Sequence, residues 1–327
     1  MSVGQTNPGQ PVSGKVRVAS LGECMIELVE RPDRTLTRGF GGDTLNTAVY
    51  LARLGVETDY VTALSDDPFS AEMLAAWQAE GIGTGAVARV PGKVPGLYLI
   101  QTDARGERRF SYWRDSAPVR QLFNLPDTAA TEAALVGYDL LYLSGITLSL
   151  FDDAGQARLF DTLDRLRAHG GRVVFDTNFR PRGWPDRARA RRVYAAMFAR
   201  ADIVLASTED HALLYEDPTP EGLLARLREA GVAERVAKLA EPACHVQAEG
   251  VDAVIAAEPV AEVVDTTAAG DSFSAAYVAA RLAGADPIAA SRVGHALAGT
   301  VIRHRGAVIP REAMPRLCLQ PSGSATD

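Results

Sequence analysis

The sequence predicts a mixed α/β fold built on a largely parallel sheet that is covered by helices on both faces. Of the 327 residues, 47% are hydrophobic, which is ample material for a large core. Along most of the chain, β-rich apolar runs alternate with segments whose apolar residues recur at helical spacing. Several of these runs, such as DLLYLSG and RVVFDTN, are apolar at consecutive positions, which is typical of strands buried on both faces.

The alternating elements can be placed from periodicity and from their end signals. The segment 44–54 has helical spacing and stops before Gly55, a residue type favoured just past a helix end. The helix that begins at Pro68 is closed in the same way by Gly81. The predicted elements are, in order, strand 16–22, helix 44–54, strand 56–64, helix 68–80, strand 139–145, helix 152–169, strand 172–178 and strand 202–207.

One segment departs from this alternation. Residues 96–114 read as two strands around a D-A-R-G turn, with no helix between them. Period-two spacing places Tyr98 and Ile100 on one face of the first strand, and Phe110, Tyr112 and Arg114 on one face of the second. A β-hairpin inserted in an α/β domain indicates a small lid, and lids of this kind cover active sites and exclude water.

Composition excludes several classes of protein. The formal charge of −7 argues against a nucleic-acid binder that neutralises phosphates. The three cysteines, Cys24, Cys244 and Cys318, are too far apart for a disulfide framework or a cysteine zinc site and suit a reducing cytoplasm. We find no signal peptide and no membrane span. One domain is expected over 15–318, with disordered tails at 1–14 and 319–327.

The most informative stretch is VVDTTAAGDSFSAAYVAARLAG, residues 263–284. We expect a β-rich run ending at Asp265, a turn, and a long helix beginning near Asp271. The backbone N–H groups of Ala268, Ala269 and Gly270 would then point from a helix N-terminus, where anions bind favourably. The Asp271 carboxylate could accept a proton from a hydroxyl there. The alternative is a plain helix cap formed by Asp271.

A second polar cluster begins the predicted helix at 44–54. Gly41 and Gly42 leave backbone exposed, while Asp43 and Asn46 offer donors and acceptors at fixed angles, as polyol hydroxyls require. For Asp43 the alternative is an ordinary N-cap. Asn46 is harder to explain structurally, because asparagine is unfavourable inside a helical turn.

Arginines supply the expected positive charge. Arg114 ends the hairpin beside Tyr112, and an arginine fork binds a carboxylate with two hydrogen bonds. Alternatively, the hairpin aromatics pack onto the core and Arg114 lies on a solvated edge. Arg180 follows the strand at 172–178, and ligands of open parallel sheets bind beyond such carboxyl ends. Because the whole protein is acidic, we expect its positive potential to be confined to these positions and the helix N-terminus.

The D-T-T-A-A-G-D-S-F string resembles the signature of the ribokinase-like (PfkB) sugar kinases. The G-E, G-G-D-T-L-N, hairpin and D-T-N-F-R-P-R-G-W motifs precede it in the chain, in the order that this family has. Similarity runs from about Val16 to about Pro315. The resemblance implies a three-layer α/β/α sandwich with a β-sheet lid, and it implies that Asp271 is the catalytic base. Within the family, the motifs are most similar to those of kinases that act on 2-keto-3-deoxygluconate, an acid sugar of the Entner-Doudoroff pathway.

The resemblance also implies ligands. The sugar contacts would be Gly41, Gly42, Asp43, Asn46, Tyr98, Tyr112, Arg114, Arg180 and Asp271, and the nucleotide contacts Asn178, Ser207, Lys238, Gly270 and His295. ATP and Mg²⁺ are implied, with Asp210 toward Mg²⁺ and a monovalent cation, K⁺, near Asp265. Two places depart from the family pattern. The run 238–244 lacks the usual glycines, and Ser207–Asp210 replaces an N-x-x-E motif.

The sequence therefore predicts an ATP-dependent kinase that phosphorylates the C6 hydroxyl of 2-keto-3-deoxygluconate. It also predicts a cytoplasmic homo-oligomer that binds neither nucleic acid nor membranes. Two alternatives stay open. One is a related kinase acting on fructose or another keto-acid sugar. The other is a sugar-sensing regulator without catalysis, which the glycine-free run 238–244 would suit.

Overall fold

A computed structural model gives the structure of the protein and describes residues 16–102 and 108–319. The expected N-terminal tail, residues 320–327 of the expected C-terminal tail, and the D-A-R-G turn lie outside these residues. Leu319 was assigned to the C-terminal tail, but it packs against the core, as Leu317 does. The predicted start of that tail is therefore wrong.

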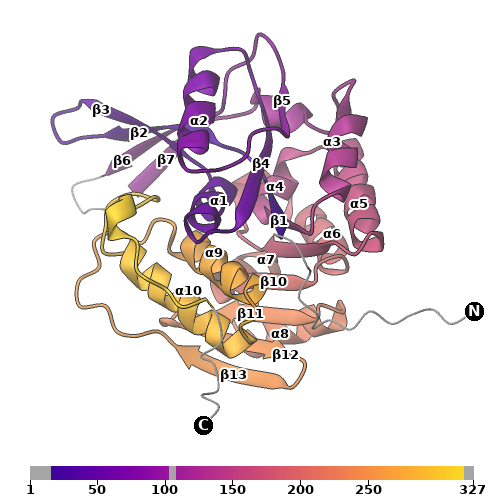
Figure 1. The fold of residues 1–327 in the computed structure, drawn as a ribbon, viewed down its shortest axis with the longest axis vertical. Coiled ribbons are helices and arrows are strands. Elements are labelled where there is room, and N and C mark those ends of the chain that lie inside the picture. The colour runs from indigo at the N-terminus through magenta and orange to yellow at the C-terminus, as the bar shows by residue number, and fades with distance from the viewer. Residues whose placement is uncertain (1–15, 103–107, 320–327) are drawn as a thin grey trace, which may run out of the picture.

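The centre of the described residues is a nine-stranded sheet with the order β13-β12-β11-β10-β9-β8-β1-β4-β5 (Figure 1). Neighbouring strands are parallel from β11 to β5, and β12 is antiparallel to both of its neighbours. The strands are β1 (Arg17–Leu21), β4 (Glu57–Leu64), β5 (Val87–Arg89), β8 (Leu140–Ser144), β9 (Arg172–Asp176), β10 (Ile203–Ser207), β11 (Glu234–Lys238), β12 (Ala243–Ala248) and β13 (Val251–Ala256).

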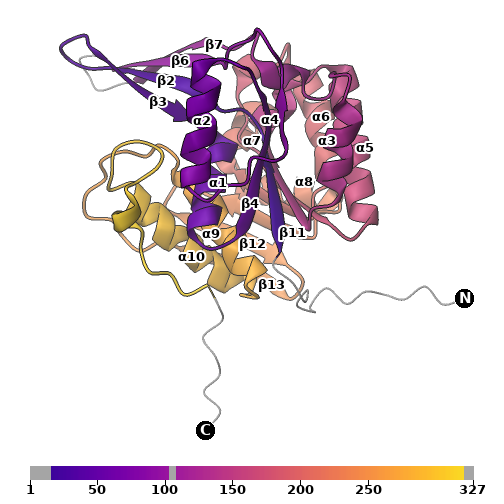
Figure 2. The ribbon, with the colours of Figure 1, turned by 45° about the horizontal axis from the view of Figure 1, so that its top comes forward.

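Helices cover both faces of this sheet, as Figures 1 and 2 show. One face carries α1 (Asp43–Arg53), α2 (Pro68–Ala79), α9 (Ala269–Leu282) and α10 (Pro287–Val301). The other carries α3 (Thr128–Val136), α4 (Gly145–Leu150), α5 (Asp153–Ala168), α6 (Arg187–Phe198), α7 (Thr208–Tyr215) and α8 (Pro220–Glu229). Within residues 16–102 and 108–319, no helix is both long and apolar enough to span a membrane. The predicted three-layer α/β architecture is confirmed.

The two cores explain why the strands are apolar at successive positions. In β8, Leu141 and Leu143 belong to the core beneath α3–α8, whereas Leu140 and Tyr142 belong to the core beneath α1, α9 and α10. Because side chains alternate between the faces of a strand, a strand with helices on both sides needs apolar residues throughout.

Local signals mark the start of α2 and the end of α1. The Asp67 side chain caps α2 by accepting hydrogen bonds from the N–H groups of Phe69 and Ser70, and Pro68 occupies the first helical position. Gly55 follows α1 with a φ of 85°, a left-handed conformation that favours glycine.

A second sheet of four strands projects from the sandwich beside α1 and α2, at the upper left of Figure 2. Its order is β3-β2-β6-β7, with β2 (Met25–Glu30), β3 (Leu36–Gly41), β6 (Leu97–Thr102) and β7 (Arg108–Trp113). Tyr98 pairs with Tyr112 across β6 and β7, so the predicted hairpin and its shared face are confirmed. The predicted lid was too small, because β2 and β3 were not recognised as strands. We call this four-stranded sheet the lid.

The β-rich run expected to end at Asp265 is not a strand. The side chains of Val263 and Val264 are 53% and 43% exposed, and the N–H groups of Val264 and Asp265 both donate to the carbonyl of Ile302. This segment crosses from β13 to α9 and bonds to the end of α10 instead of to a neighbouring strand. The local β preference is overridden because no strand lies beside it.

Candidate active site

The N-termini of α1 and α9 meet beyond the carboxyl ends of the central strands. Asn46 in α1 donates a hydrogen bond from Nδ2 to Oδ2 of Asp271 in α9, at 2.8 Å. Thr47 also contacts α9, donating from Oγ1 to the carbonyl oxygen of Asp271 at 3.4 Å. Two predicted site residues that are 225 positions apart in the sequence therefore touch. The Oδ1 atom of Asn46 is buried and has no hydrogen-bond partner among the described residues, so it can accept a bond from a ligand hydroxyl.

The Asp271 carboxyl lies in surroundings that favour its protonated form. Burial is the main cause, and repulsion from the nearby Asp43 carboxylate adds to it, so the pKa of Asp271 is raised to about 7. The hydrogen bond from Asn46 acts in the opposite direction by stabilising the charged form. A carboxyl with a pKa close to neutrality can both take up and release a proton at physiological pH, as a general base must.

The residues of the predicted anion hole form the turn before α9 and the start of this helix. Ala268 is the N-cap, with a left-handed φ of 59°, and its carbonyl accepts the first helical bond, from Ser272. The N–H of Ala269 already donates to the carbonyl of Thr266 at 3.2 Å, so it is engaged within the turn. Gly270 follows in the first helical turn, where N–H groups lack helical acceptors. A Cβ added at Gly270 would lie 3.5 Å from Nζ of Lys238, which places this lysine beside the turn.

Lys238 is held by an acid that we did not select from the sequence. Its Nζ atom lies 2.9 Å from Oδ2 of Asp176, at the end of β9. The same Oδ2 atom accepts hydrogen bonds from Ser274 at 2.8 Å and Tyr142 at 3.3 Å. The sequence did contain a signal for Asp176. It is the aspartate of D-T-N at the end of a buried strand, and ligands gather at such strand ends.

No residue in the glycine-free run 238–244 has a positive φ among the described residues. The run joins β11 to β12 as a hairpin, in which the N–H of Leu239 donates to the carbonyl of Ala243. The turn therefore does not need the conformational freedom of glycine.

The polar cluster at the start of α1 lies on the same side as Asp271. Asp43 is the first residue of α1 and the N-cap is Gly42, so the alternative that Asp43 caps the helix is wrong. The Asp43 carboxylate accepts a hydrogen bond of 2.6 Å from Nδ2 of Asn178. Asn178 was expected to contact nucleotide, and the structure places it beside Asp43, a predicted sugar ligand. Gly42 is required by packing, because a Cβ there would lie 2.1 Å from the carbonyl oxygen of Glu23.

The lid presents aromatic side chains on one face. The rings of Tyr98 and Tyr112 lie 5.9 Å apart, and the Phe110 ring stacks beside Tyr112 with centroids 6.2 Å apart. The Tyr98 hydroxyl donates to the Glu27 carboxylate, so its polar end is fixed while its ring is buried. Tyr112 is more exposed and remains available to a ligand.

Arg114, directly after β7, forms an ion pair with Glu23 between β1 and β2. The arginine therefore lies inward and not on a solvated edge, and that alternative is wrong. Glu23 and Glu27 are further residues of this end of the site that we did not select from the sequence, although Glu23 belongs to the quoted G-E motif.

The residues expected near Mg²⁺ lie where β9 and β10 end. Oδ2 of Asp210 accepts a hydrogen bond from Thr177 at 2.8 Å, and its Oδ1 lies 3.5 Å from Nη1 of Arg180. Burial raises the pKa of Asp210 despite these partners. Ser207 is engaged as the N-cap of α7, accepting from the N–H of Asp210. The Asp210 carboxylate, in the first turn of α7, fits Mg²⁺, because this ion uses one or two carboxylates together with nucleotide phosphates.

His295 and Asp265 have partners in other parts of the fold. The His295 ring lies 3.1 Å from the carbonyl oxygen of Ile255 through Nε2 and packs against Phe273, and burial lowers its pKa. Asp265 accepts bonds from Thr267 and from the N–H of Gly306, which tie the loop before α9 to the chain after α10. In the described ranges there is no group of three or more His, Cys, Asp or Glu side chains that could hold a metal ion.

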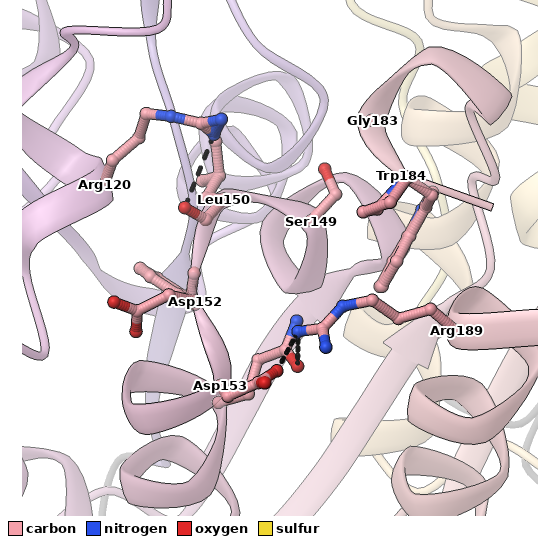
Figure 3. Close-up of a pocket in the computed structure, with 11 residues that line it drawn as sticks. Arg120, Ser149, Leu150, Asp152, Asp153, Gly183, Trp184 and Arg189 are labelled. Carbon is pink, nitrogen blue, oxygen red and sulfur yellow. Dashed lines mark hydrogen bonds and ion pairs between the residues drawn. The ribbon is translucent and has the colours of Figure 1, made fainter.

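A cavity of about 530 Å³ lies between the end of α4, the start of α5 and the start of α6 (Figure 3). Arg189 pairs there with Asp153, and Arg120 donates to the carbonyl of Leu150 at 3.4 Å. None of the predicted catalytic, sugar or nucleotide residues lines it. The cavity is therefore separate from the residues that the sequence predicts for the site, which lie at the N-termini of α1 and α9.

Comparison with known proteins decides the family. Residues 15–314 match the profile of the pfkB family carbohydrate kinases. The chain belongs to this family. The pfkB family assignment confirms the resemblance inferred from the motifs, and it means that the chain is a carbohydrate kinase by family.

Individual pfkB family relatives agree with this assignment. A 2-dehydro-3-deoxygluconokinase of Dickeya dadantii is 46% identical over 305 residues, covering 91% of this chain and 98% of that protein. The Escherichia coli K12 protein of the same name is 44% identical over 306 residues, covering 91% and 99%. Among solved structures, a fructokinase of Xylella fastidiosa with bound ATP has a TM-score of 0.78 at 23% identity, covering 92% of this chain and 95% of that one.

Proposed function

We propose that this protein transfers the γ-phosphoryl group of ATP to the C6 hydroxyl of 2-keto-3-deoxygluconate (2-dehydro-3-deoxygluconate). The observation that carries the proposal is the half-buried Asp271 carboxyl at the N-terminus of α9, which is bonded to Asn46 and has a pKa of about 7. The names of the relatives that are 44–46% identical support this acid sugar as the substrate.

Each group of the site has a part in the proposed reaction. Asp271 accepts the proton of the C6 hydroxyl while the hydroxyl oxygen attacks the γ-phosphorus of ATP. The bond between the γ-phosphorus and the ADP oxygen breaks, and ADP leaves. Asp43 and Asn46 orient the sugar. Phosphoryl transfer requires little covalent chemistry from the protein, so position and charge account for most of the rate.

The N–H groups of Ala268, Ala269 and Gly270 are the proposed anion hole for the transferred phosphoryl group. Ala269 must exchange its bond to Thr266 in order to take part. Lys238 and Arg180 add positive charge, and Mg²⁺ near Asp210 would neutralise phosphate charge when bound. The parts of Ser207 and His295 in nucleotide binding, and of Asp265 toward K⁺, stay predictions of the sequence.

The lid supplies specificity in this proposal. Tyr98 and Tyr112 cover the sugar, and the Arg114 guanidinium binds its carboxylate, a group that neutral sugars lack. Exclusion of water by the lid would also limit the hydrolysis of ATP. The cytoplasmic location and the homo-oligomeric state stay predictions of the sequence.

A coupled assay of ADP release across a panel of acid and neutral sugars tests the function. We expect turnover with 2-keto-3-deoxygluconate and little with fructose. In Arg114→Leu, KM for the acid sugar should rise steeply while KM for ATP stays the same. Comparable turnover of fructose and the acid sugar by the wild-type protein would contradict the proposed substrate. A protein that binds the sugar but no ATP analogue would be a sugar-sensing regulator.

A further inference from the structure

The proposed acid-sugar end of the site contains a buried acid for which the mechanism above has no use. Glu23 is 3% exposed, and its ion-pair partner among the described residues is Arg114. Neither carboxylate oxygen receives a hydrogen bond of regular geometry from the described residues. A buried carboxylate with so little compensation is costly, since it loses its hydration without equivalent bonds. It therefore needs an explanation beyond packing.

The surroundings show that space has been kept for this ion pair. A Cβ added at Gly96, the residue before β6, would lie 2.8 Å from Oε1 of Glu23 and 3.0 Å from Cβ of Arg114. The Glu23 carbonyl also packs against Gly42, directly before Asp43. Glu23 therefore connects the lid, through Arg114, with the start of α1, where the sugar ligands lie.

Among the described residues, the ion-pair partner of Arg114 is Glu23. Its Nε and Nη2 atoms are buried, and Nη2 is the atom that pairs with Glu23. Nη1 is not among the buried unpaired atoms, and the side chain retains 21% exposure. A guanidinium fixed along one edge can offer its other nitrogen to a second anion in a defined direction.

Several charged groups act on Glu23. Arg114 at the end of the lid and Arg120 on the segment after it favour the carboxylate, whereas Asp43 at the start of α1 opposes it. Burial is the largest influence and raises the pKa of Glu23.

We propose that Glu23 is a positioning residue for the acid substrate: it fixes the Arg114 guanidinium at the base of the lid so that its free edge receives the sugar carboxylate. This inference rests on the proposed function, because it takes the substrate to be an acid sugar. Without Glu23, Arg114 would carry an unpaired buried charge and would turn toward solvent. The substrate would then have to order this side chain again on binding, at a cost in affinity.

A double-mutant cycle tests the proposal with the full-length protein, using Glu23→Gln, Arg114→Leu and the double variant. We expect Glu23→Gln to raise KM for 2-keto-3-deoxygluconate at least tenfold, with a much smaller change in kcat and none in KM for ATP. In the Arg114→Leu background, the same substitution should change KM by less than twofold. A role in stability alone would instead give equal effects in both backgrounds.

The matched control is Glu234→Gln, which removes the acid of another buried pair, with Arg281 at 2.8 Å. Glu234 begins β11 at the amino end of the sheet, away from the strand ends that carry the site. Its loss should lower the melting temperature and leave KM for the acid sugar unchanged. If Arg114→Leu does not fold, Gly96→Ala replaces it, because the added methyl group disturbs the ion pair without removing a charge. Gly96→Ala should then raise KM for the acid sugar and leave KM for ATP unchanged.

The outcomes separate the two proposals. A wild-type protein that does not turn over the acid sugar overturns the proposed function and, with it, this inference. A wild-type protein that does, combined with an unchanged KM in Glu23→Gln or with equal effects in both backgrounds, overturns the inference alone.

Discussion

Asp271→Asn should make the protein more stable and inactive at the same time. The folded state raises the pKa of Asp271 from its ordinary value of 3.8 to about 7, mainly through burial. Between these two values the folded protein holds a proton that the unfolded chain has released. The stability that this proton provides is present below pH 3.8 and is lost as the pH rises through 7. Above that range the folded protein holds the Asp271 carboxylate in surroundings that disfavour its charge.

The size of the effect follows from the two pKa values. At roughly 1.4 kcal/mol per pH unit, the difference corresponds to about 4 kcal/mol at pH 8. Asparagine has the same shape without the charge, and its amide oxygen can accept the bond from Asn46. For a chain of this length, about 4 kcal/mol corresponds to a rise in melting temperature of roughly 8 °C.

Thermal unfolding of both proteins between pH 4 and pH 8, followed by circular dichroism, measures this difference. The two melting temperatures should be close at pH 4 and diverge toward pH 8, while turnover falls at least about a hundredfold. The control is Asp33→Asn, at an exposed position where hydrogen bonds from Thr35 lower the pKa of the carboxyl. The melting temperature of this variant should not rise above that of the wild-type protein toward pH 8. An equal difference at pH 4 and pH 8, or a less stable variant at pH 8, would refute the reasoning.

Three further predictions use the same site. In the wild-type protein, kcat/KM should fall about tenfold per pH unit below about pH 7, because Asp271 must be deprotonated to act as the base. A flat profile of kcat/KM from pH 5.5 to 8 would exclude this role. Ala268→Gly should stabilise the protein by about 1 kcal/mol, seen in denaturant unfolding, because glycine adopts the left-handed φ of 59° without strain; a loss of stability would show that the turn is not strained. Gly42→Ala should lower both the melting temperature and turnover, because its Cβ would lie 2.1 Å from the Glu23 carbonyl oxygen; wild-type turnover would show that the backbone can move there without cost.

Elements that depend on neighbouring residues could be predicted from the sequence. The Asp67 cap, Pro68 and the left-handed glycines are signals within one or two turns of the residues that they organise. For the same reason the apolar runs predict the bounds of β8 and β9 to within two residues. The run before Asp265 failed because its β preference is met only if another strand lies beside it, and none does.

The lid shows the same limit. The hairpin β6–β7 could be predicted because its strands are adjacent in the sequence. The parallel pairing of β2 with β6 could not, because some seventy residues separate Leu28 from its partner Leu99 and no local signal connects them.

The sequence by itself determined the fold class, the family motifs and the kinds of side chain that the site contains. Only the tertiary structure decided which of them meet: Asn46 with Asp271, Asn178 with Asp43, and Glu23 with Arg114. These pairs are made by strand ends and helix N-termini that converge at one edge of the sheet. Their charges and pKa values follow from burial and distance, and both exist only once the chain has folded.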